Sequence, residues 1–294
     1  YVLANAMRPM WKDGDEIIVS CQDHEANAGA WRRLAQRGMK VIEWHVDKEN
    51  GMLDVEVLKG LFSSRTKMLA FPHCSNVIGY INPVKEISKL AHEHGALSVV
   101  DGVGWAPHGF PDLRDLGADV YMFSSYKTYG PHLGVMYVNK NLMGKLENQS
   151  HFFKEGIPKS MITPAGPDHA QIATINGILD YFDALYECHF DTKAVPAQRN
   201  QALNRLFRKH EETLQETLLE FLRSRSDVRI VGPDSNKNRA PIVAILPKNK
   251  PVMEVYNGLI QHQLMLGYGD FYAARPLMDM DCLLYTSDAA DELT

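Results

Sequence analysis

Over the first 140 residues, short apolar runs alternate with segments whose apolar positions recur every three or four residues. The runs are rich in β-branched and aromatic side chains, which predicts buried strands, and the other segments predict amphipathic helices. Because the two kinds alternate, we expect an α/β fold in which a mostly parallel sheet is sandwiched by helices. The predicted strands are 16–20, 41–44, 66–71, 97–100, 120–123 and 135–138, and the clearest predicted helices are 54–62 and 83–94.

The pattern changes beyond residue 139. A polar, Gly/Pro-rich stretch is followed by two long amphipathic segments, two short apolar runs and a further helical pattern. We expect a large domain over residues 1–189 and a smaller α+β C-terminal domain, of which 190–281 form part. Residues 282–294 are small and acidic, and we interpret them as a non-native tail, with a frayed acidic terminus as the alternative. The predicted elements are helices at 170–186, 196–223 and 252–262, and strands at 228–231 and 242–246.

Composition narrows the class of protein without naming it. Apolar residues make up 45% and charged residues 23% of the 294 residues, which is ordinary for a globular protein. The net charge of -5 gives no reason to expect nucleic acid or an anionic membrane as a partner. No apolar run approaches the ~20 residues of a membrane span. The four cysteines are scattered without CxxC spacing, so we expect neither structural zinc nor a disulfide framework, and a reducing, cytoplasmic location.

Two residues in the stretch 96–138 are candidates for chemistry. Asp101 follows one predicted strand and Lys127 follows the next, and ligands of open α/β sheets bind beyond the carboxyl ends of strands. A lysine in a hydroxyl-rich, partly desolvated pocket can form a Schiff base, and a buried carboxylate can hold a protonated ring nitrogen. The structural alternatives are a surface lysine and an aspartate that caps a helix.

Further polar residues follow other predicted strands. His24 could stack on a planar cofactor, and the amide of Asn76 could donate to a phenolic oxygen, although either residue could be purely structural. A competing interpretation makes His24, His73, Cys74 and His108 a metal site. No helical HxxxH or paired cysteine spacing supports it, so we predict no metal.

Taken together, these motifs resemble those of the class V aminotransferase family of fold type I, and among its branches the cysteine desulfurase-like proteins. The resemblance covers roughly residues 1–280. It rests on Val100-Asp101-Gly102, Ala106-Pro107-His108, the run from Phe123 to Pro131, Asp23-His24-Glu25-Ala26-Asn27 and His73-Cys74-Ser75-Asn76.

The resemblance implies a role for each matching residue. It implies pyridoxal 5'-phosphate as cofactor, with Lys127 as the Schiff-base lysine and later proton shuttle. Asp101 would hold the pyridine nitrogen protonated, His24 would stack on the ring, and Asn76 would bond its O3′ atom. Ser124 would bind the phosphate, and Tyr126 stands where relatives carry a phosphate-binding histidine. A homodimer and a small amino-acid substrate are implied by the same analogy.

Departures from the family pattern leave more than one reaction compatible with the sequence. Gly104 stands where relatives often have Gln, and 166–169 lacks the threonine of a phosphate motif contributed by the partner subunit. The loop 267–277 has no cysteine, which desulfurases need to attack sulfur, and Arg275 is a weak candidate for the substrate carboxylate. We also expect a chain truncated at both ends relative to the family. The alternatives to a desulfurase are an aminotransferase, lyase or epimerase, or an inactive fragment that serves as a binding module.

Overall fold

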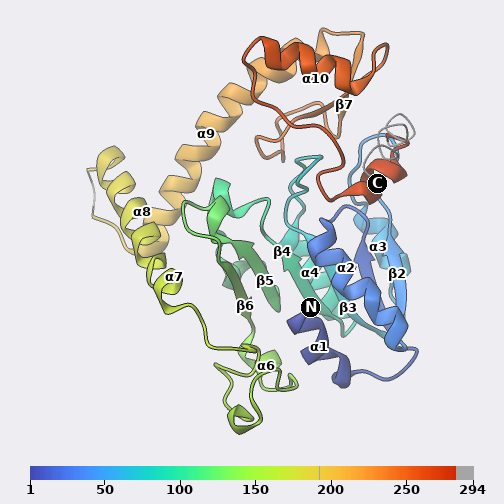
Figure 1. The fold of residues 1–294 in the computed structure, drawn as a ribbon, viewed down its shortest axis with the longest axis vertical. Coiled ribbons are helices and arrows are strands. Elements are labelled where there is room, and N and C mark those ends of the chain that lie inside the picture. The colour runs from blue at the N-terminus through green and yellow to red at the C-terminus, as the bar shows by residue number, and fades with distance from the viewer. Residues whose placement is uncertain (192, 283–294) are drawn as a thin grey trace.

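The computed structural model describes residues 1–191 and 193–282, and the tail predicted at 282–294 lies outside them except for Cys282. A six-stranded sheet in the order β2-β1-β3-β4-β5-β6 forms the centre of the molecule (Figure 1). All neighbouring strands are parallel except β5 and β6, so the predicted mostly parallel sheet is confirmed. The strands are β1 Glu16–Ser20, β2 Lys40–Trp44, β3 Thr66–Pro72, β4 Leu97–Asp101, β5 Val120–Ser124 and β6 Gly134–Val138.

Alternation along the strands sends side chains to two cores, one on each face of the sheet. In β1, Ile18 packs into one core, while Ile17 and Val19 pack into the other. Leu58 and Ile87 place α3 and α4 on the face of Ile18, and helices α1 and α2 cover the opposite face. The predicted sandwich therefore follows from period-two burial in the strands. The helices are α1 Val2–Met7, α2 Glu25–Arg32, α3 Val55–Leu61 and α4 Val84–Glu93.

A second sheet, of two strands, lies near the C-terminal end of the long helix α9 (Figure 1). Helix α9, Pro196–Arg223, runs from α8 to the antiparallel pair β7, Val228–Val231, and β8, Ala244–Pro247. The bounds of α9 match the predicted helix at both ends. The remaining helices are α5 Leu113–Leu116, α6 Lys140–Met143, α7 His169–Ala173, α8 Ile175–His189, α10 Val252–Gln261 and α11 Ala274–Asp279.

Two predicted elements differ in the structure. The single helix expected at 170–186 is split at Thr174, whose hydroxyl donates to the Gln171 carbonyl at 2.6 Å and so competes with the helical ladder. The strand expected at 242–246 starts two residues later, because the Ile242 carbonyl accepts a bond from the buried side chain of Arg239 at 2.9 Å. Within the described part of the chain, no helix is long and apolar enough to cross a membrane.

Candidate functional site

Four polar residues lie at the carboxyl ends of four adjacent parallel strands. His24 follows β1, Asn76 follows β3, Asp101 ends β4, and Lys127 ends the short 3₁₀ helix that continues β5. Since the sheet order is β1-β3-β4-β5 and these strands are parallel, the four residues line one edge of the sheet. We call His24, Asn76, Asp101 and Lys127 the strand-end row. The structure thus brings together four residues that are up to 103 positions apart in the chain.

The carboxyl group of Asp101 is buried next to a second buried acid, Asp23. Burial raises the pKa of Asp101, although the Val103 N–H, which donates at 2.8 Å, and the charge of Lys127 act in the opposite direction. Burial and the charge of Asp101 raise the pKa of Asp23 well above its ordinary value. Asp101 caps a turn through Val103 rather than a helix. A cation placed against this carboxylate would therefore relieve a buried and poorly compensated charge.

The imidazole of His24 has one nitrogen engaged and one free for other contacts. Its Nδ1 accepts the Ala26 N–H at 3.0 Å and caps α2, so the neutral ring carries its proton on Nε2. Burial, and then the charge of Lys127, lower the pKa of His24. A neutral, half-buried ring suits a residue that stacks on a flat ligand. The ring of Tyr272 lies 5.4 Å from the His24 ring, between centroids.

A loop from the C-terminal part of the chain closes over the row. The Asn76 side-chain amide donates to the Phe271 carbonyl at 2.9 Å, and the Glu25 N–H donates to the Tyr272 carbonyl at 2.8 Å. Phe271 and Tyr272 both have left-handed backbones, with φ of 51° and 58°, a conformation that costs energy in residues other than glycine. The Oδ1 atom of Asn76 is buried without a hydrogen-bond partner, so the row contains one orphan polar atom that a ligand could satisfy.

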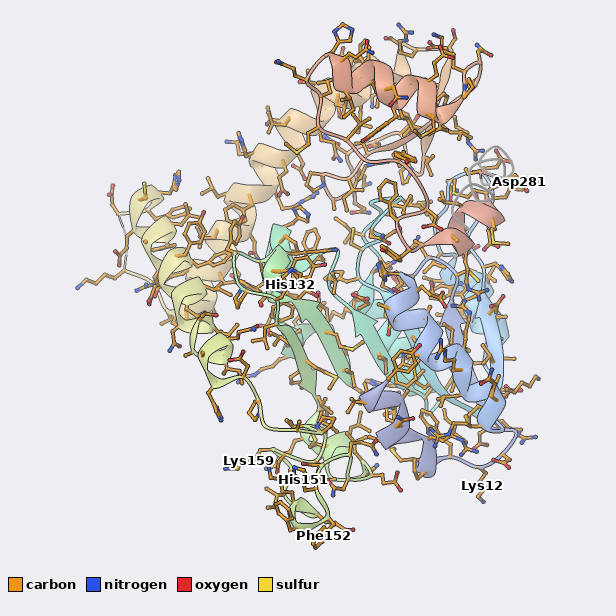
Figure 2. All side chains as sticks on the ribbon, viewed as in Figure 1. Lys12, His132, His151, Phe152, Lys159 and Asp281 are labelled. Atoms are coloured by element: carbon orange, nitrogen blue, oxygen red, sulfur yellow. The ribbon has the colours of Figure 1, made fainter. Side chains whose placement is uncertain are left out.

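The turn that carries Lys127 is held by its own backbone and by the hydroxyl groups of Ser125 and Thr128. The Ser125 hydroxyl donates to the Pro131 carbonyl at 2.6 Å, whereas the half-buried Ser124 makes no capping bond with its side chain. Tyr126 is exposed and stacks on His132, with ring centroids 4.5 Å apart; Figure 2 labels His132 beyond the upper ends of β5 and β6. Lys127 is exposed, and its Nζ lies 5.9 Å from the centroid of the Tyr126 ring.

Other predicted candidates have different partners. Arg275 lies in α11, with Nε 3.8 Å from Glu25 and one terminal nitrogen 3.3 Å from Glu43. His73 Nδ1 lies 2.8 Å from the Tyr121 hydroxyl, and His108 Nδ1 lies 2.7 Å from a Glu211 carboxylate oxygen. Burial lowers the pKa of His73 to about 3. Among residues 1–191 and 193–282, the donor atoms of His24, His73, Cys74 and His108 do not form a group of three that could hold one ion.

Sequence reasoning missed two residues at this site. In the sequence, Asp23 stands out only as the neighbour of His24, yet its carboxylate accepts from the His24 N–H at 2.9 Å and from the Asn27 amide at 2.5 Å. The position of an acid directly before a strand-end histidine was the available signal. Tyr272 could not be found, because no local pattern links it to a residue 248 positions earlier.

Comparison with known proteins places this geometry in a family. Residues 1–153 match the family described as aminotransferase class-V. The aminotransferase-like protein FGM3 of Gibberella zeae is 32% identical over 89% of this chain and 63% of its own length. A cysteine desulfurase of Escherichia coli O9:H4 is 40% identical over 45% of this chain and 33% of its own length. The chain thus spans less than two thirds of these relatives.

The fold is shared with a solved desulfurase. The apo structure of a cysteine desulfurase from Thermococcus onnurineus NA1 superposes with a TM-score of 0.79, over 95% of this chain and 68% of the other, at 22% identity. That likeness establishes the fold, and the expected fold type I architecture is confirmed. The family match covers more than half of the sequence and includes three strand ends of the row and Lys127. This chain belongs to the class V aminotransferase family.

Proposed function

We propose that this chain forms the cofactor-binding region of a pyridoxal 5'-phosphate-dependent enzyme that acts on a small amino acid, in the manner of the cysteine desulfurase-like proteins. The observation that carries the proposal is the strand-end row, in which a lysine and a buried carboxylate lie at the ends of adjacent strands. Family membership and the cysteine desulfurases among the relatives support the same class of chemistry.

The residues fit this cofactor on structural grounds. Among the described residues, no cation forms an ion pair with the buried carboxylate of Asp101, on which Lys127 acts only through its charge, and a protonated ring nitrogen would supply a partner. The orphan Oδ1 of Asn76 marks a place for a polar ligand atom. One family contact is excluded, because a Cβ atom at Gly104 would lie 2.5 Å from the Cys74 carbonyl oxygen. A glutamine therefore has no room at that position.

When bound, pyridoxal phosphate supplies an electron sink for carbon acids next to an amine. Asp101 would hold the proton on the ring nitrogen, since its buried carboxylate has few other ways to be compensated. Lys127 would hold and move a proton at the substrate's α-carbon. His24 would cover one ring face without adding a charge, because its pKa is lowered. Ser124 and Tyr126 would offer hydroxyl groups to the phosphate.

A second candidate function is an aminotransferase, lyase or epimerase without desulfurase activity. It is favoured because the loop 267–277, which closes over the row, has no cysteine. Cys282 is buried, and its thiol lies 3.6 Å from the Met280 carbonyl oxygen. A buried thiol with a raised pKa is a poor nucleophile, and burial is the main cause of that shift. Sulfide release from L-cysteine separates the two candidates.

The proposal extends to organisation and location. Residues 1–189 would form the cofactor-binding domain and 190–281 part of a smaller domain. We propose a homodimer, supported by the exposed rings of Tyr129, in the lysine turn, and Tyr181, whose centroids lie 5.0 Å apart. The cysteines among the described residues are free and form no disulfide, which fits a reducing compartment such as the cytoplasm. If pyridoxal phosphate is not trapped on Lys127, the alternative is that the chain is an inactive fragment that only binds a partner.

The direct test uses Lys127→Ala with Lys145→Ala as the matched control. Lys145 is an exposed lysine on the same domain. We expect the wild type and Lys145→Ala to take up pyridoxal phosphate with a yellow absorbance that borohydride traps covalently on the protein. Lys127→Ala should lose the covalent trapping while keeping the far-ultraviolet circular dichroism of the wild type.

Peptide mapping of the trapped adduct makes the test specific to this site. The adduct should lie on the peptide that contains Lys127. A wild-type protein that stays colourless at saturating cofactor, or trapping that persists in Lys127→Ala, would refute the proposal.

A further inference from the structure

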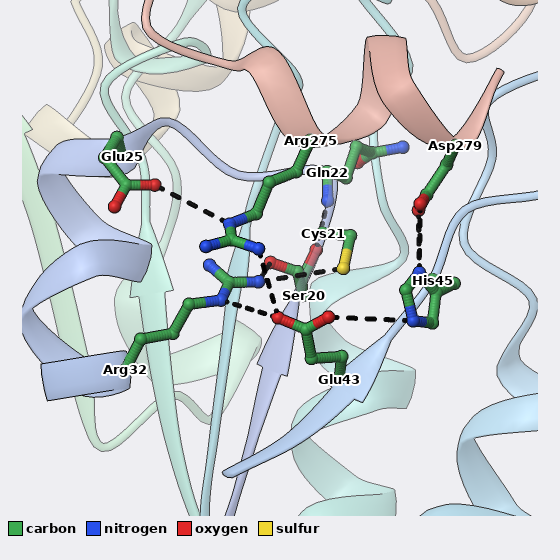
Figure 3. Close-up of polar contacts among 9 residues, drawn as sticks. All are labelled: Ser20, Cys21, Gln22, Glu25, Arg32, Glu43, His45, Arg275 and Asp279. Atoms are coloured by element: carbon green, nitrogen blue, oxygen red, sulfur yellow. Dashed lines mark hydrogen bonds and ion pairs between the residues drawn. The ribbon is translucent and has the colours of Figure 1, made fainter. Parts of the chain in front are cut away.

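A cluster of metal-type donors lies at the edge of the sheet, next to the strand-end row. Cys21 follows β1, Glu43 lies in β2 and His45 follows β2 (Figure 3). The Cys21 thiol, a Glu43 carboxylate oxygen and a His45 ring nitrogen lie within 4.8 Å of one another. Among residues 1–191 and 193–282, no other set of three such donors comes so close. We call these three residues, with Asp279, Arg32 and Arg275 around them, the edge cluster.

A carboxylate orients His45 for metal binding. His45 Nδ1 lies 3.0 Å from each carboxylate oxygen of Asp279, which belongs to α11 (Figure 3). With Nδ1–H donated to Asp279, the lone pair is on Nε2, which lies 3.7 Å from Glu43 Oε2. Metal-binding histidines almost always donate their other ring N–H in this way. Nothing in the proposed cofactor chemistry requires this arrangement.

The two oxygens of Glu43 have different surroundings. Oε1 accepts from Arg32 Nε at 2.9 Å and from Arg275 at 3.3 Å, whereas Oε2 faces His45. Burial acts against ionisation of Glu43, but its bond to Arg32 and the nearby positive charges leave its pKa below the ordinary value. Glu43 is therefore a carboxylate with one oxygen fixed by arginine and the other available for a cation.

The positive charges of the two arginines do not balance all the negative charges of the site. Arg32 also lies 3.6 Å from the Cys21 sulfur. Glu25, Glu43 and Asp279 carry negative charges, and a Cys21 thiolate would add one, against the positive charges of Arg32 and Arg275 (Figure 3). With neutral His45, that balance leaves two negative charges, which one divalent cation would neutralise.

We propose that Cys21, Glu43 and His45 bind one divalent transition metal of the zinc class, with Asp279 as the residue that orients His45. Sulfur, imidazole and carboxylate together are the ligands of Zn²⁺ and similar ions, whereas Mg²⁺ and Ca²⁺ select oxygen. Zinc ligands at about 2.0–2.3 Å place their donor atoms roughly 3.3–3.8 Å apart, so the cluster needs to contract by about 1 Å. His45 is exposed, which leaves solvent to supply a fourth ligand.

A bound metal would hold α11 against the edge of the sheet through the contact between His45 and Asp279. Asp279 and Arg275 are on α11, directly after the loop whose Phe271 and Tyr272 carbonyls close over the strand-end row. A bound ion would therefore stabilise the folded protein by mass action and hold that loop in place.

The test is a Co²⁺ titration of the full chain after treatment with a chelator, with and without pyridoxal phosphate. We expect one equivalent to bind and to produce a near-ultraviolet charge-transfer band from thiolate to cobalt. Zn²⁺ should displace the cobalt. This readout does not need enzyme activity, so it fails or succeeds independently of the proposed function.

Four variants make the test specific. Cys21→Ser should abolish the charge-transfer band, and His45→Asn, at an exposed position, should weaken binding more than Asp279→Asn, which should cost about 10–100-fold. Cys188→Ser, which changes an exposed cysteine, should bind cobalt like the wild type. Thermal unfolding without metal checks that each variant folds. A band that survives Cys21→Ser, affinity unchanged in His45→Asn, or no binding at millimolar Co²⁺ overturns the proposal and leaves an ion-pair network.

Discussion

The strand-end row and the edge cluster lie at the same end of one sheet, yet the pKa values of their carboxyl groups are shifted in opposite directions. In the row, Asp101 and Asp23 are buried together, and their pKa values are raised by burial. In the edge cluster, Glu43 is paired with two arginines, and its pKa is lowered. The row holds buried acids whose charge burial disfavours, and the edge cluster holds acids whose charge two arginines compensate in part.

The difference follows from strand position. Asp101 and Asp23 lie at the ends of the central strands, where both side chains are buried between neighbours. The edge cluster lies where β2 forms the border of the sheet, and long side chains from α2 and α11 can reach in from outside. Buried acids without a paired cation prepare a place for a positively charged group of a ligand. At the edge, the arginines join α2 and α11 to the sheet and leave part of the negative charge for a cation. Three substitutions would break or sharpen this contrast.

Asp101→Asn should have the largest effect on activity. Loss of a charge-assisted hydrogen bond, worth about 1.5–3 kcal/mol, predicts an activity about 10–150-fold lower with pyridoxal phosphate. Steady-state turnover of the best amino-acid substrate measures this. Activity that stays within about twofold of the wild type would remove Asp101 from the proposed site.

The same variant has a distinct pH signature in the cofactor-free protein. Because the folded pKa of Asp101 is raised, its favourable contribution is complete below the ordinary carboxyl pKa of about 3.9 and is lost as pH rises through the folded value. Asp101→Asn should therefore unfold at a higher denaturant concentration than the wild type at pH 7, with a smaller difference at pH 4. Denaturant titration at both pH values checks the sign.

Gly102→Ala tests how rigidly the row is held. A Cβ atom at this position would lie 2.1 Å from the ring of Tyr121, which is buried and whose hydroxyl contacts His73 at 2.8 Å. Overpacking of this kind costs about 1–3 kcal/mol of unfolding free energy. Gly60→Ala is the matched control, since nothing lies within 4 Å of its Cβ position in helix α3, and it should stabilise the protein by about 0.5–1 kcal/mol. Equal effects of the two changes would contradict a rigid row.

Arg275→Ala should have the smallest effect on stability. Its ion pairs with Glu25 and Glu43 are partly exposed, so we expect a loss of about 0–1 kcal/mol that shrinks as salt rises. Denaturant unfolding at low and high salt measures it, with Lys85→Ala, which removes an exposed pair with Asp115, as the control. An increase in KM for the amino acid without a change in kcat would instead identify Arg275 as the contact for the substrate carboxylate.

Much of the fold could be predicted because its signals are local. The bounds of α9 follow from a proline at its first turn and a regular amphipathic pattern. Gly38 and Gly95, with φ of 87° and 72°, end the segments before β2 and β4. The break at Thr174 and the late start of β8 could not be predicted, because each depends on one hydrogen bond from a side chain to a backbone carbonyl.

The sequence by itself determined that Asp101 and Lys127 come at or just after the ends of two successive strands, and that a cysteine is lacking between 267 and 277. The order of the strands, and with it the alignment of His24, Asn76, Asp101 and Lys127, needed the parallel sheet. Only the tertiary structure placed Asp279 against His45 and Tyr272 beside His24, since these contacts join residues more than 230 positions apart. Periodicity records which face of an element is buried, but it carries no information about which distant element covers that face.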